Sequence, residues 1–340
     1  MDAYKEGDQM KHILTIGTGG TIASEQSVSG LTPELDASQL LRYVPQVNDL
    51  CTVDCIQPFS LDSTNITPEH WEILAALIEQ NYNAYDGFVI THGTDTMAYT
   101  AAALSYLIQH SPKPIVLTGS QKPIVSDNTD SKQNLYDSFV CACSDMSGVV
   151  VVFNGKVILG TRARKTRTKS FQAFSSINYP ELAYIRDGKV IEFIRPERQS
   201  EPVFFHKLNQ KVALLKIIPG TSASLIRYLL QNNDGLVVES FGVGGVPSYE
   251  QSGFRDELRE SMANGKTVVL TTQVENEGSD LSIYSVGSGL KTDPGVLEAY
   301  DMTTEAVVAK LMWILGQTND RDEIRRLFNT PVANDLLTAT

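Results

Sequence analysis

The chain has 340 residues, of which 42% are hydrophobic and 20% charged, and its 40 acidic against 28 basic side chains give a formal net charge of -12. Length and composition indicate a folded protein of about two domains and exclude a disordered chain, a collagen and a disulfide-stapled miniprotein. Nucleic-acid binding is also disfavoured, because a phosphate backbone requires a basic protein face.

Several other classes of site and location are disfavoured on similar grounds. No segment approaches the roughly 20 apolar residues of a membrane span, and no basic stretch near the N-terminus leads into an apolar one, so we expect a cytoplasmic protein with no membrane contact. The four cysteines, Cys51, Cys55, Cys141 and Cys143, lack zinc-site spacing and are expected to be reduced thiols. With five scattered histidines, no metal site is predicted.

In chain order, short β-branched runs alternate with helical periodicity, a pattern typical of βαβ units around a parallel sheet. The first half predicts strands at 12–16, 87–91, 114–118 and 149–153, and helices at 96–109 and 133–143. A polar, proline-flanked stretch at 195–202 then suits a linker. The second half predicts strands at 212–217, 236–239 and 267–272, and helices at 222–231, 251–264, 304–316 and 320–329.

The predicted fold class is therefore α/β, with two open, mostly parallel α/β domains joined by a linker. We place the larger N-terminal domain at residues 1–194, the linker at 195–210 and the smaller C-terminal domain at 211–340.

Four predicted strands of the first half end in glycine and small hydroxyl or amide residues: Thr18-Gly-Gly-Thr21, Thr91-His-Gly-Thr-Asp-Thr96, Thr118-Gly-Ser-Gln121 and Asn154-Gly155. One such end alone is ordinary turn or cap chemistry. Because the carboxyl ends of parallel strands meet at one edge of a sheet, four of them favour a shared ligand site.

The glycine-containing segments lack the motifs of several known site classes, and this excludes some kinds of chemistry. The first run has Ile22 where a dinucleotide fingerprint needs its third glycine, and neither a P-loop nor a Gly-x-Ser-x-Gly elbow is present, which disfavours a dehydrogenase and an α/β-hydrolase. The chemistry that these segments do suit is a threonine nucleophile beside glycine-flanked backbone N–H groups. It needs a proton acceptor, which Thr94-Asp95 or a lysine of the basic stretch 162–169 offers.

Two of these segments, Thr18-Gly-Gly-Thr-Ile-Ala23 and Thr91-His-Gly-Thr-Asp-Thr-Met97, resemble the signature motifs of the bacterial-type L-asparaginases, in which a threonine attacks the side-chain amide. Further similar segments lie at 62–68, 118–121, 160–165 and 241–245, so the resemblance runs from about residue 12 to 330. The second signature and the absence of a leader favour the cytosolic type I branch.

The resemblance implies a role for each matching position. Thr21 is the expected nucleophile, which forms a β-aspartyl ester, while Thr94, Asp95 and Lys165 relay protons and activate water for deacylation. Ser63 and Thr64 would bind the substrate α-carboxylate and Asp95 its α-ammonium group, with backbone groups near Thr21 and Thr94 as the oxyanion hole. The full set of implied substrate-binding residues is Thr18, Gly20, Asp62, Ser63, Thr64, Gly93 and Ser120.

Many members of the family carry a tyrosine just after the first signature, but the stretch Ser24 to Pro33 contains none here, and Leu31 stands near the expected position. Tyr284 resembles a position that supplies a tyrosine in some cytosolic members, so it is included among the catalytic candidates. His92 is expected to be structural, and Arg162 and Lys169 are expected to be surface or interface charges.

The role of Lys165 needs a separate argument. As a base at neutral pH its pKa would have to fall about three units from about 10.4, a cost of about 4 kcal/mol. A neighbouring Asp95 carboxylate favours the charged form instead. We therefore interpret Lys165 as a cation that orients Asp95 and Thr94, with the proton leaving through Thr94 or water.

The function implied by the resemblance is that of an L-asparagine amidohydrolase, which forms L-aspartate and ammonia through a threonyl ester without a metal or organic cofactor, in a homodimer or homotetramer. One alternative is the amide-hydrolysing subunit of a tRNA-dependent amidotransferase, which carries an extra N-terminal domain, whereas 11 residues precede the first predicted strand here. Another is a catalytically silent amino-acid-binding protein. Selectivity against glutamine stays open, because one methylene contributes only about 1–3 kcal/mol.

Overall fold

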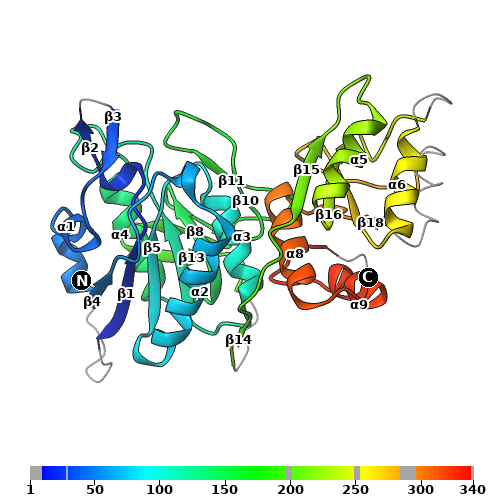
Figure 1. Cartoon of the computed structure of the whole chain (residues 1–340). Helices are drawn as coiled ribbons and strands as arrows, with labels where there is room; N and C mark the ends of the chain where they lie inside the picture. Colours follow the sequence, from blue (N-terminus) through cyan, green and yellow to red (C-terminus); the bar gives the residue numbers. More distant parts are fainter. Residues whose placement is uncertain (1–9, 28–29, 196–200, 249–252, 284–295, 338–340) are drawn as a thin grey trace. The chain divides into compact units, whose positions relative to one another are not determined.

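The computed structural model describes residues 10–27, 30–195, 201–248, 253–283 and 296–337. It divides the chain into two compact α/β units (Figure 1), the first formed by Met1–Ser176 and Pro180–Phe204 and the second by Ile177–Tyr179 and Phe205–Thr340. The short piece at 177–179 belongs to the second unit because the Asn178 side chain donates to the carbonyl of Asp301 and accepts from the amide of Glu277.

The first unit is built on an eight-stranded sheet with the order β13-β12-β9-β8-β7-β5-β1-β4. Strands β4, β1, β5, β7 and β8 are parallel, and β9, β12 and β13 extend the sheet in antiparallel fashion. The central strands β5 and β7 are buried at every residue, as expected where helices cover both faces. The bounds are β1 Lys11–Gly17, β4 Cys51–Ile56, β5 Gly87–Thr91, β7 Pro114–Thr118, β8 Gly148–Phe153, β9 Lys156–Leu159, β12 Ala183–Arg186 and β13 Lys189–Glu192.

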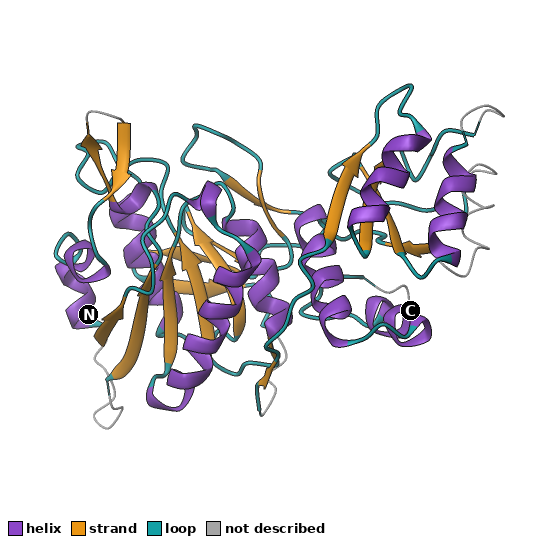
Figure 2. Ribbon diagram, in the orientation of Figure 1, coloured by secondary structure: helices purple, strands orange, loops and turns teal. Residues whose placement is uncertain are grey.

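Helices cover both faces of this sheet (Figure 2). Helix α2 packs with α3 on one face, and α4 lies with η2 and α1 on the other. The β5–α3–β7 and β7–α4–β8 connections step across the sheet in the same direction but use opposite faces, so their crossovers have opposite hands, a departure from the usual uniform right-handedness. The bounds are α1 Ala37–Leu41, α2 Pro68–Asn81, α3 Met97–Leu107 and α4 Ser131–Ala142.

Short elements connect these layers in the first unit. Three small antiparallel pairs are β2 Ser24–Ser27 with β3 Gly30–Pro33, β6 Ile108–Gln109 with β14 Val203–Phe204, and β10 Ala163–Lys165 with β11 Phe174–Ser176. The 3-10 turns are η1 Thr21–Ala23, η2 Pro45–Asp49, η3 Ser63–Asn65 and η4 Tyr82–Ala84.

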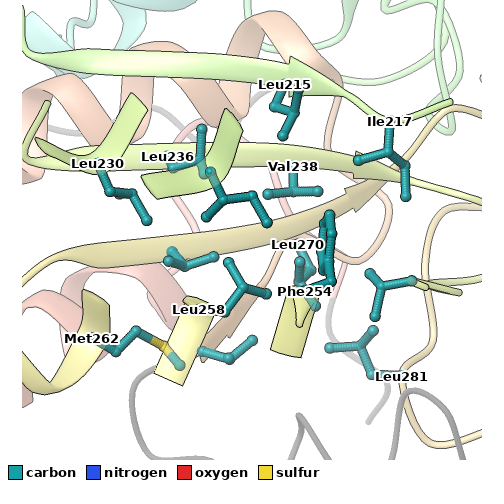
Figure 3. Close-up of a cluster of buried hydrophobic side chains, with 14 residues drawn as sticks. Leu215, Ile217, Leu230, Leu236, Val238, Phe254, Leu258, Met262, Leu270 and Leu281 are labelled. Carbon is teal, nitrogen blue, oxygen red and sulfur yellow. The ribbon is translucent and has the colours of Figure 1, made fainter. Parts of the chain in front are cut away.

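The second unit contains a parallel sheet with the order β15-β16-β17-β18. Helices α5 and α6 pack against each other and against the sheet, and α8 packs on β15 and β16 and carries α9. Its core joins strand residues such as Leu236, Val238 and Leu270 to Phe254 and Leu258 of α6 (Figure 3). The bounds are β15 Val212–Lys216, β16 Gly235–Ser240, β17 Thr267–Thr272, β18 Val296–Glu298, α5 Ala223–Asn232, α6 Phe254–Ala263, α8 Thr304–Gln317 and α9 Arg321–Asn329.

The predicted fold class is confirmed, with a larger N-terminal α/β part and a smaller C-terminal one. The predicted helix 96–109 ends at Leu107, because Ile108–Gln109 pairs with β14 as a strand, and that partner strand falls within the predicted linker. Helix α2 was missed, although Pro68 at its first turn and the Thr67/His70 capping box mark its start. In the described part of the chain, no helix has the length and apolar run that crossing a membrane requires.

Candidate active site

The loops that follow β1, β4, β5 and β7 are joined by main-chain hydrogen bonds that continue past the strand ends. The amide of Thr18 donates to the carbonyl of Thr91 (3.0 Å), and that of His92 donates to the carbonyl of Thr118 (2.8 Å). On the other side, Leu61 N donates to Thr18 O and Gly20 N to Leu61 O, both at 2.9 Å. Three of the four glycine-rich strand ends therefore meet at one edge of the sheet, as expected.

The fourth strand end, Asn154-Gly155, serves as the hairpin turn between β8 and β9. Both residues have positive φ, 51° and 73°, which is the conformation that an Asn-Gly type I′ turn requires. The main-chain amide of Asn154 donates to Asn134 Oδ1 (2.8 Å). The composition of this end is thus explained by turn geometry.

The two signature loops touch through their glycines. A Cβ added to Gly20, which has φ of 80°, would lie 2.3 Å from the backbone N of Gly93, and one added to Gly93 would lie 2.6 Å from Ser63 Oγ. Thr21 follows Gly20 directly and opens η1, whose Ile22 is buried while Thr21 itself stays partly exposed. The hydroxyl-bearing residue is therefore beside the Gly93 loop and accessible.

Lys165, Thr94 and Asp95 form one hydrogen-bonded cluster. Lys165, the last residue of β10, donates from Nζ to Thr94 Oγ1 (2.7 Å) and to Asp95 Oδ1 (2.6 Å). The Thr94 side chain is buried within the loop that follows β5, whereas the Asp95 side chain is 59% exposed and that of Lys165 is 15% exposed. Three of the predicted catalytic residues are thus in direct contact although 71 positions separate Lys165 from Thr94.

Gln121 is a member of this cluster whose side chain the sequence did not single out. Its side-chain Oε1 accepts from Thr94 Oγ1 (3.2 Å). Its Nε2 donates to the carbonyls of Arg167 (3.4 Å) and Ser170 (3.1 Å), which ties Thr94 to the loop after Lys165. The backbone of Gln121 is held by Asp130, whose pKa burial raises above its usual value.

Ser120, predicted to contact substrate, is fully buried, and its hydroxyl donates to the carbonyl of Lys122 (2.5 Å). Thr18 is likewise buried, and its hydroxyl donates to Thr91 O (2.9 Å). Both side chains thus stabilise the loops themselves.

The η3 turn carries Ser63 and Thr64, which were expected to bind the substrate α-carboxylate, and Asp62, also an expected substrate-binding residue, directly precedes it. Asp62 Oδ1 accepts from the amide (2.9 Å) and the hydroxyl (2.7 Å) of Thr64, so Asp62 caps the turn. Ser63 is buried, and its carbonyl accepts from Thr96 Oγ1 (2.7 Å), which docks the turn on the second signature loop. This contact brings all three residues to the same edge of the sheet as Thr94.

Two remaining expectations have different outcomes. Tyr284 lies outside the described residues. Arg162 was expected to be a surface or interface charge and this is wrong: it is fully buried within the chain, since β10, which begins at the next residue, packs against α3. Lys169, in contrast, is exposed as expected.

The cluster offers hydroxyls, a carboxylate, an ammonium group and backbone N–H groups within one loop system, which is a set suited to nucleophilic attack on a carbonyl with proton transfer. Among the described residues, no group of three His, Cys, Asp or Glu side chains is arranged to hold a metal ion.

The sequence matches the family model described as "Asparaginase, N-terminal" over residues 12–198 and that of the "Glutaminase/Asparaginase C-terminal domain" over residues 211–328. It is 39% identical to an L-asparaginase of Thermococcus kodakarensis, over 95% of this chain and 98% of that protein. It is 34% identical to L-asparaginase 1 of Escherichia coli, over 96% and 98% of the two chains. A subunit of the glutamyl-tRNA(Gln) amidotransferase of Pyrococcus horikoshii is 33% identical over 98% of this chain and 79% of its own length.

Solved structures show the same relationship. The structure of the thermostable L-asparaginase from Thermococcus kodakarensis superposes with a TM-score of 0.92 at 38% identity, covering 96% of this chain and all of that one. A probable cytoplasmic L-asparaginase from Campylobacter jejuni superposes with a TM-score of 0.79 at 29% identity, over 94% and 99% of the chains.

Proposed function

Because the chain belongs to the asparaginase family, we propose that it hydrolyses L-asparagine to L-aspartate and ammonia. The resemblance expected from the two signature segments is thereby confirmed at the level of the family. The observation that carries the proposal is the cluster in which Lys165 Nζ donates to Thr94 Oγ1 and Asp95 Oδ1, next to the Gly20–Gly93 contact beside Thr21.

The reaction proceeds in two displacements at the side-chain carboxamide carbon. In the first, the Thr21 oxygen bonds to that carbon, the C–N bond breaks and the departing nitrogen takes a proton to leave as ammonia. In the second, a water oxygen bonds to the same carbon, the ester C–O bond breaks and Thr21 recovers its proton. Each displacement develops negative charge on the carbonyl oxygen, which backbone N–H groups near Thr21 and Thr94 stabilise.

Lys165 acts as a fixed cation in this scheme. Two of its N–H groups are directed at Thr94 and Asp95, and the carboxylate stabilises the ammonium group electrostatically. The Thr94 oxygen accepts from Lys165 and donates to Gln121, which leaves one lone pair that can accept a hydrogen bond from Thr21 or from the hydrolytic water. When Thr94 takes that proton it releases its own hydroxyl proton, which goes to the departing nitrogen in the first displacement and to the Thr21 oxygen in the second. Proton transfer therefore runs through Thr94.

The test is Thr21→Ala, assayed by ammonia release from L-asparagine. Loss of a covalent nucleophile is expected to reduce kcat about 10⁴-fold, by analogy with serine triads. The control is Thr52→Ala, which removes an exposed hydroxyl of β4 that donates only to the backbone of Lys11, and which should leave kcat unchanged. Near-normal turnover by Thr21→Ala would end the proposal.

The two alternative functions are separated by the same assay. The match to the amidotransferase subunit covers only 79% of that protein, whereas the L-asparaginases are matched over almost their whole length. Ammonia release by the purified chain without tRNA or another protein supports the asparaginase. Release only after their addition favours the amidotransferase, and asparagine binding with no release favours a silent binding protein.

We also infer a homodimer or homotetramer in the cytoplasm. Exposed apolar side chains support self-association: on α5, Leu225 and Tyr228 are 41% and 65% exposed at the i, i+3 spacing of one helix face. Light scattering should give a mass of two or four chains, reduced by Tyr228→Glu. The location is supported by likeness to a probable cytoplasmic L-asparaginase and is tested by cell fractionation.

A further inference from the structure

A chain of three buried polar side chains lies behind the second signature loop, outside the Lys165–Thr94–Asp95 cluster. Trp71 of α2 donates from Nε1 to Thr100 Oγ1 of α3 (2.9 Å), and Thr100 Oγ1 is 3.0 Å from His92 Nε2. His92 Nδ1 is in turn 2.7 Å from the carbonyl oxygen of Gly93. His92 and Thr100 are completely buried and Trp71 is 5% exposed.

The chemistry of the partners determines the direction of every bond in this chain. The carbonyl of Gly93 can only accept, so His92 Nδ1 carries a proton and donates it. Burial lowers the pKa of His92 to about 4, so the ring is neutral at physiological pH and Nε2 has no proton. Nε2 therefore accepts from the hydroxyl of Thr100, whose oxygen accepts from the indole N–H of Trp71.

This arrangement orients one peptide unit of the active-site loop. Gly93 has no side chain to restrict rotation of the peptide that follows it, and its carbonyl is held by the imidazole. In a planar trans peptide the C=O and N–H groups point in opposite directions, so the N–H of Thr94 faces away from His92. The main chain of His92 is itself fixed, because its amide donates to Thr118 and its carbonyl lies against Gly119.

We propose that His92 is a positioning residue, and that the Trp71–Thr100–His92 chain holds the Gly93–Thr94 peptide so that the Thr94 N–H donates to the oxyanion of the tetrahedral intermediate. The inference rests on the proposed amide hydrolysis and adds to it a residue for which we expected only packing. An oxyanion donor that is lost or turned away reduces kcat by about 10²–10³-fold.

Three variants, each assayed by ammonia release, test the direction of the hydrogen bonds between Trp71, Thr100 and His92. Thr100→Val keeps the shape but removes the hydroxyl that donates to Nε2, so the imidazole loses one of the two hydrogen bonds that fix its orientation toward the Gly93 carbonyl. We expect kcat to fall at least tenfold with KM changed less than threefold. Trp71→Phe removes only the far donor and should keep kcat within threefold. His92→Leu should lose about 10²-fold in kcat.

The conservative variant His92→Asn distinguishes positioning from packing, because its amide nitrogen can replace Nδ1 as a donor to Gly93 O. It should recover at least tenfold in kcat over His92→Leu, in proteins with matched melting temperatures. Equal kcat for His92→Asn and His92→Leu, or losses confined to KM, would overturn the proposal.

A measurement independent of activity uses the full chain labelled with ¹⁵N-histidine. The spectrum of the wild-type protein should show a buried neutral histidine protonated at Nδ1. In Thr100→Val the Nε2 resonance should shift, because Nε2 loses its hydrogen-bond donor, while the proton stays on Nδ1. If His92 in the wild-type protein carried its proton on Nε2, the proposed hydrogen bonds from Trp71 through Thr100 to His92 would be refuted. If the wild-type protein released no ammonia while the Nδ1–H form was observed, the proposed function would fail and the hydrogen-bond chain would stand.

Discussion

Replacing Lys165 by methionine removes the cation from the active-site cluster while keeping most of the side-chain volume. Lys165 Nζ bonds Thr94 Oγ1 at 2.7 Å and Asp95 Oδ1 at 2.6 Å, so the change leaves Thr94 with one hydrogen-bond partner, Gln121, and leaves Asp95 without this contact. The loss of these two contacts can lower the stability of the protein or its turnover, and the structure predicts a different magnitude for each.

The structure predicts a small effect on stability. The Asp95 side chain is 59% exposed, so its ion pair is screened by water and contributes at most about 1 kcal/mol. The Thr94 hydroxyl keeps its bond to Gln121, so the lost hydrogen bond adds about 1 kcal/mol. At about 2–4 °C per kcal/mol for a folding unit of the size of the first one, the melting temperature of that unit should fall by less than about 8 °C.

The expected effect on turnover is larger. Proton transfer by a positioned group contributes about 10²–10⁴-fold to rate, which is about 3–5 kcal/mol of activation free energy. Because the free energy of unfolding falls by only about 2 kcal/mol, Lys165→Met should be folded at 25 °C. Because the activation free energy rises by about 3–5 kcal/mol, the folded variant should lose 10²–10⁴-fold in kcat/KM.

The assay is ammonia release from L-asparagine, with thermal unfolding measured on the same samples. Lys156→Met is the matched control: its ion pair with Glu181 has an N–O distance of 2.8 Å and both side chains are 25% exposed, but neither belongs to the cluster. It should destabilise the chain about as little and leave kcat/KM within twofold. Retention of more than a tenth of the wild-type kcat/KM by Lys165→Met, or an equal loss in Lys156→Met, would refute the reasoning.

Three further predictions concern packing and pH. Gly20→Ala should abolish turnover, because the added Cβ would lie 2.3 Å from the backbone nitrogen of Gly93. The control Gly220→Ala has a similar φ of 85° but open space around it, so thermal unfolding should show a stability loss of only about 1–2 kcal/mol. Normal activity of Gly20→Ala would contradict this prediction. Burial raises the pKa of Asp137 to about 6 from 3.8, so the folded state binds more protons between these values and stability falls as pH rises through them. Asp137→Asn should therefore gain about 2–3 kcal/mol in urea unfolding at pH 7.5 and little at pH 4, and an equal gain at both would disprove the linkage. Lys310 and Asp335 form a fully buried ion pair with an N–O distance of 2.8 Å. Lys310→Met should therefore lower the free energy of unfolding by about 3–5 kcal/mol, because it leaves the Asp335 carboxylate buried without its cation, and the double variant with Asp335→Leu should lose less. If urea unfolding showed that the two losses simply add, the two residues would not be coupled.

The sequence by itself determined the fold class and the segments that make the candidate site. Strand and helix periodicity is a local property of consecutive residues, so β5, β7 and β17 coincide with their predicted ranges and most other predicted elements differ by one or two residues. Glycine and hydroxyl residues after three strands indicated the site edge, because parallel strands end on the same side. The family resemblance added an expected role to each position.

Only the tertiary structure decided which side chains meet. The contact of Lys165 with Thr94 depends on where the β10–β11 pair docks, and no local pattern encodes the carbonyls that Gln121 reaches at Arg167. The burial of Arg162 and the tautomer of His92 depend likewise on packing against other elements. Such partners are distant in sequence and are selected by the free energy of packing the whole unit, which propensity and spacing do not contain.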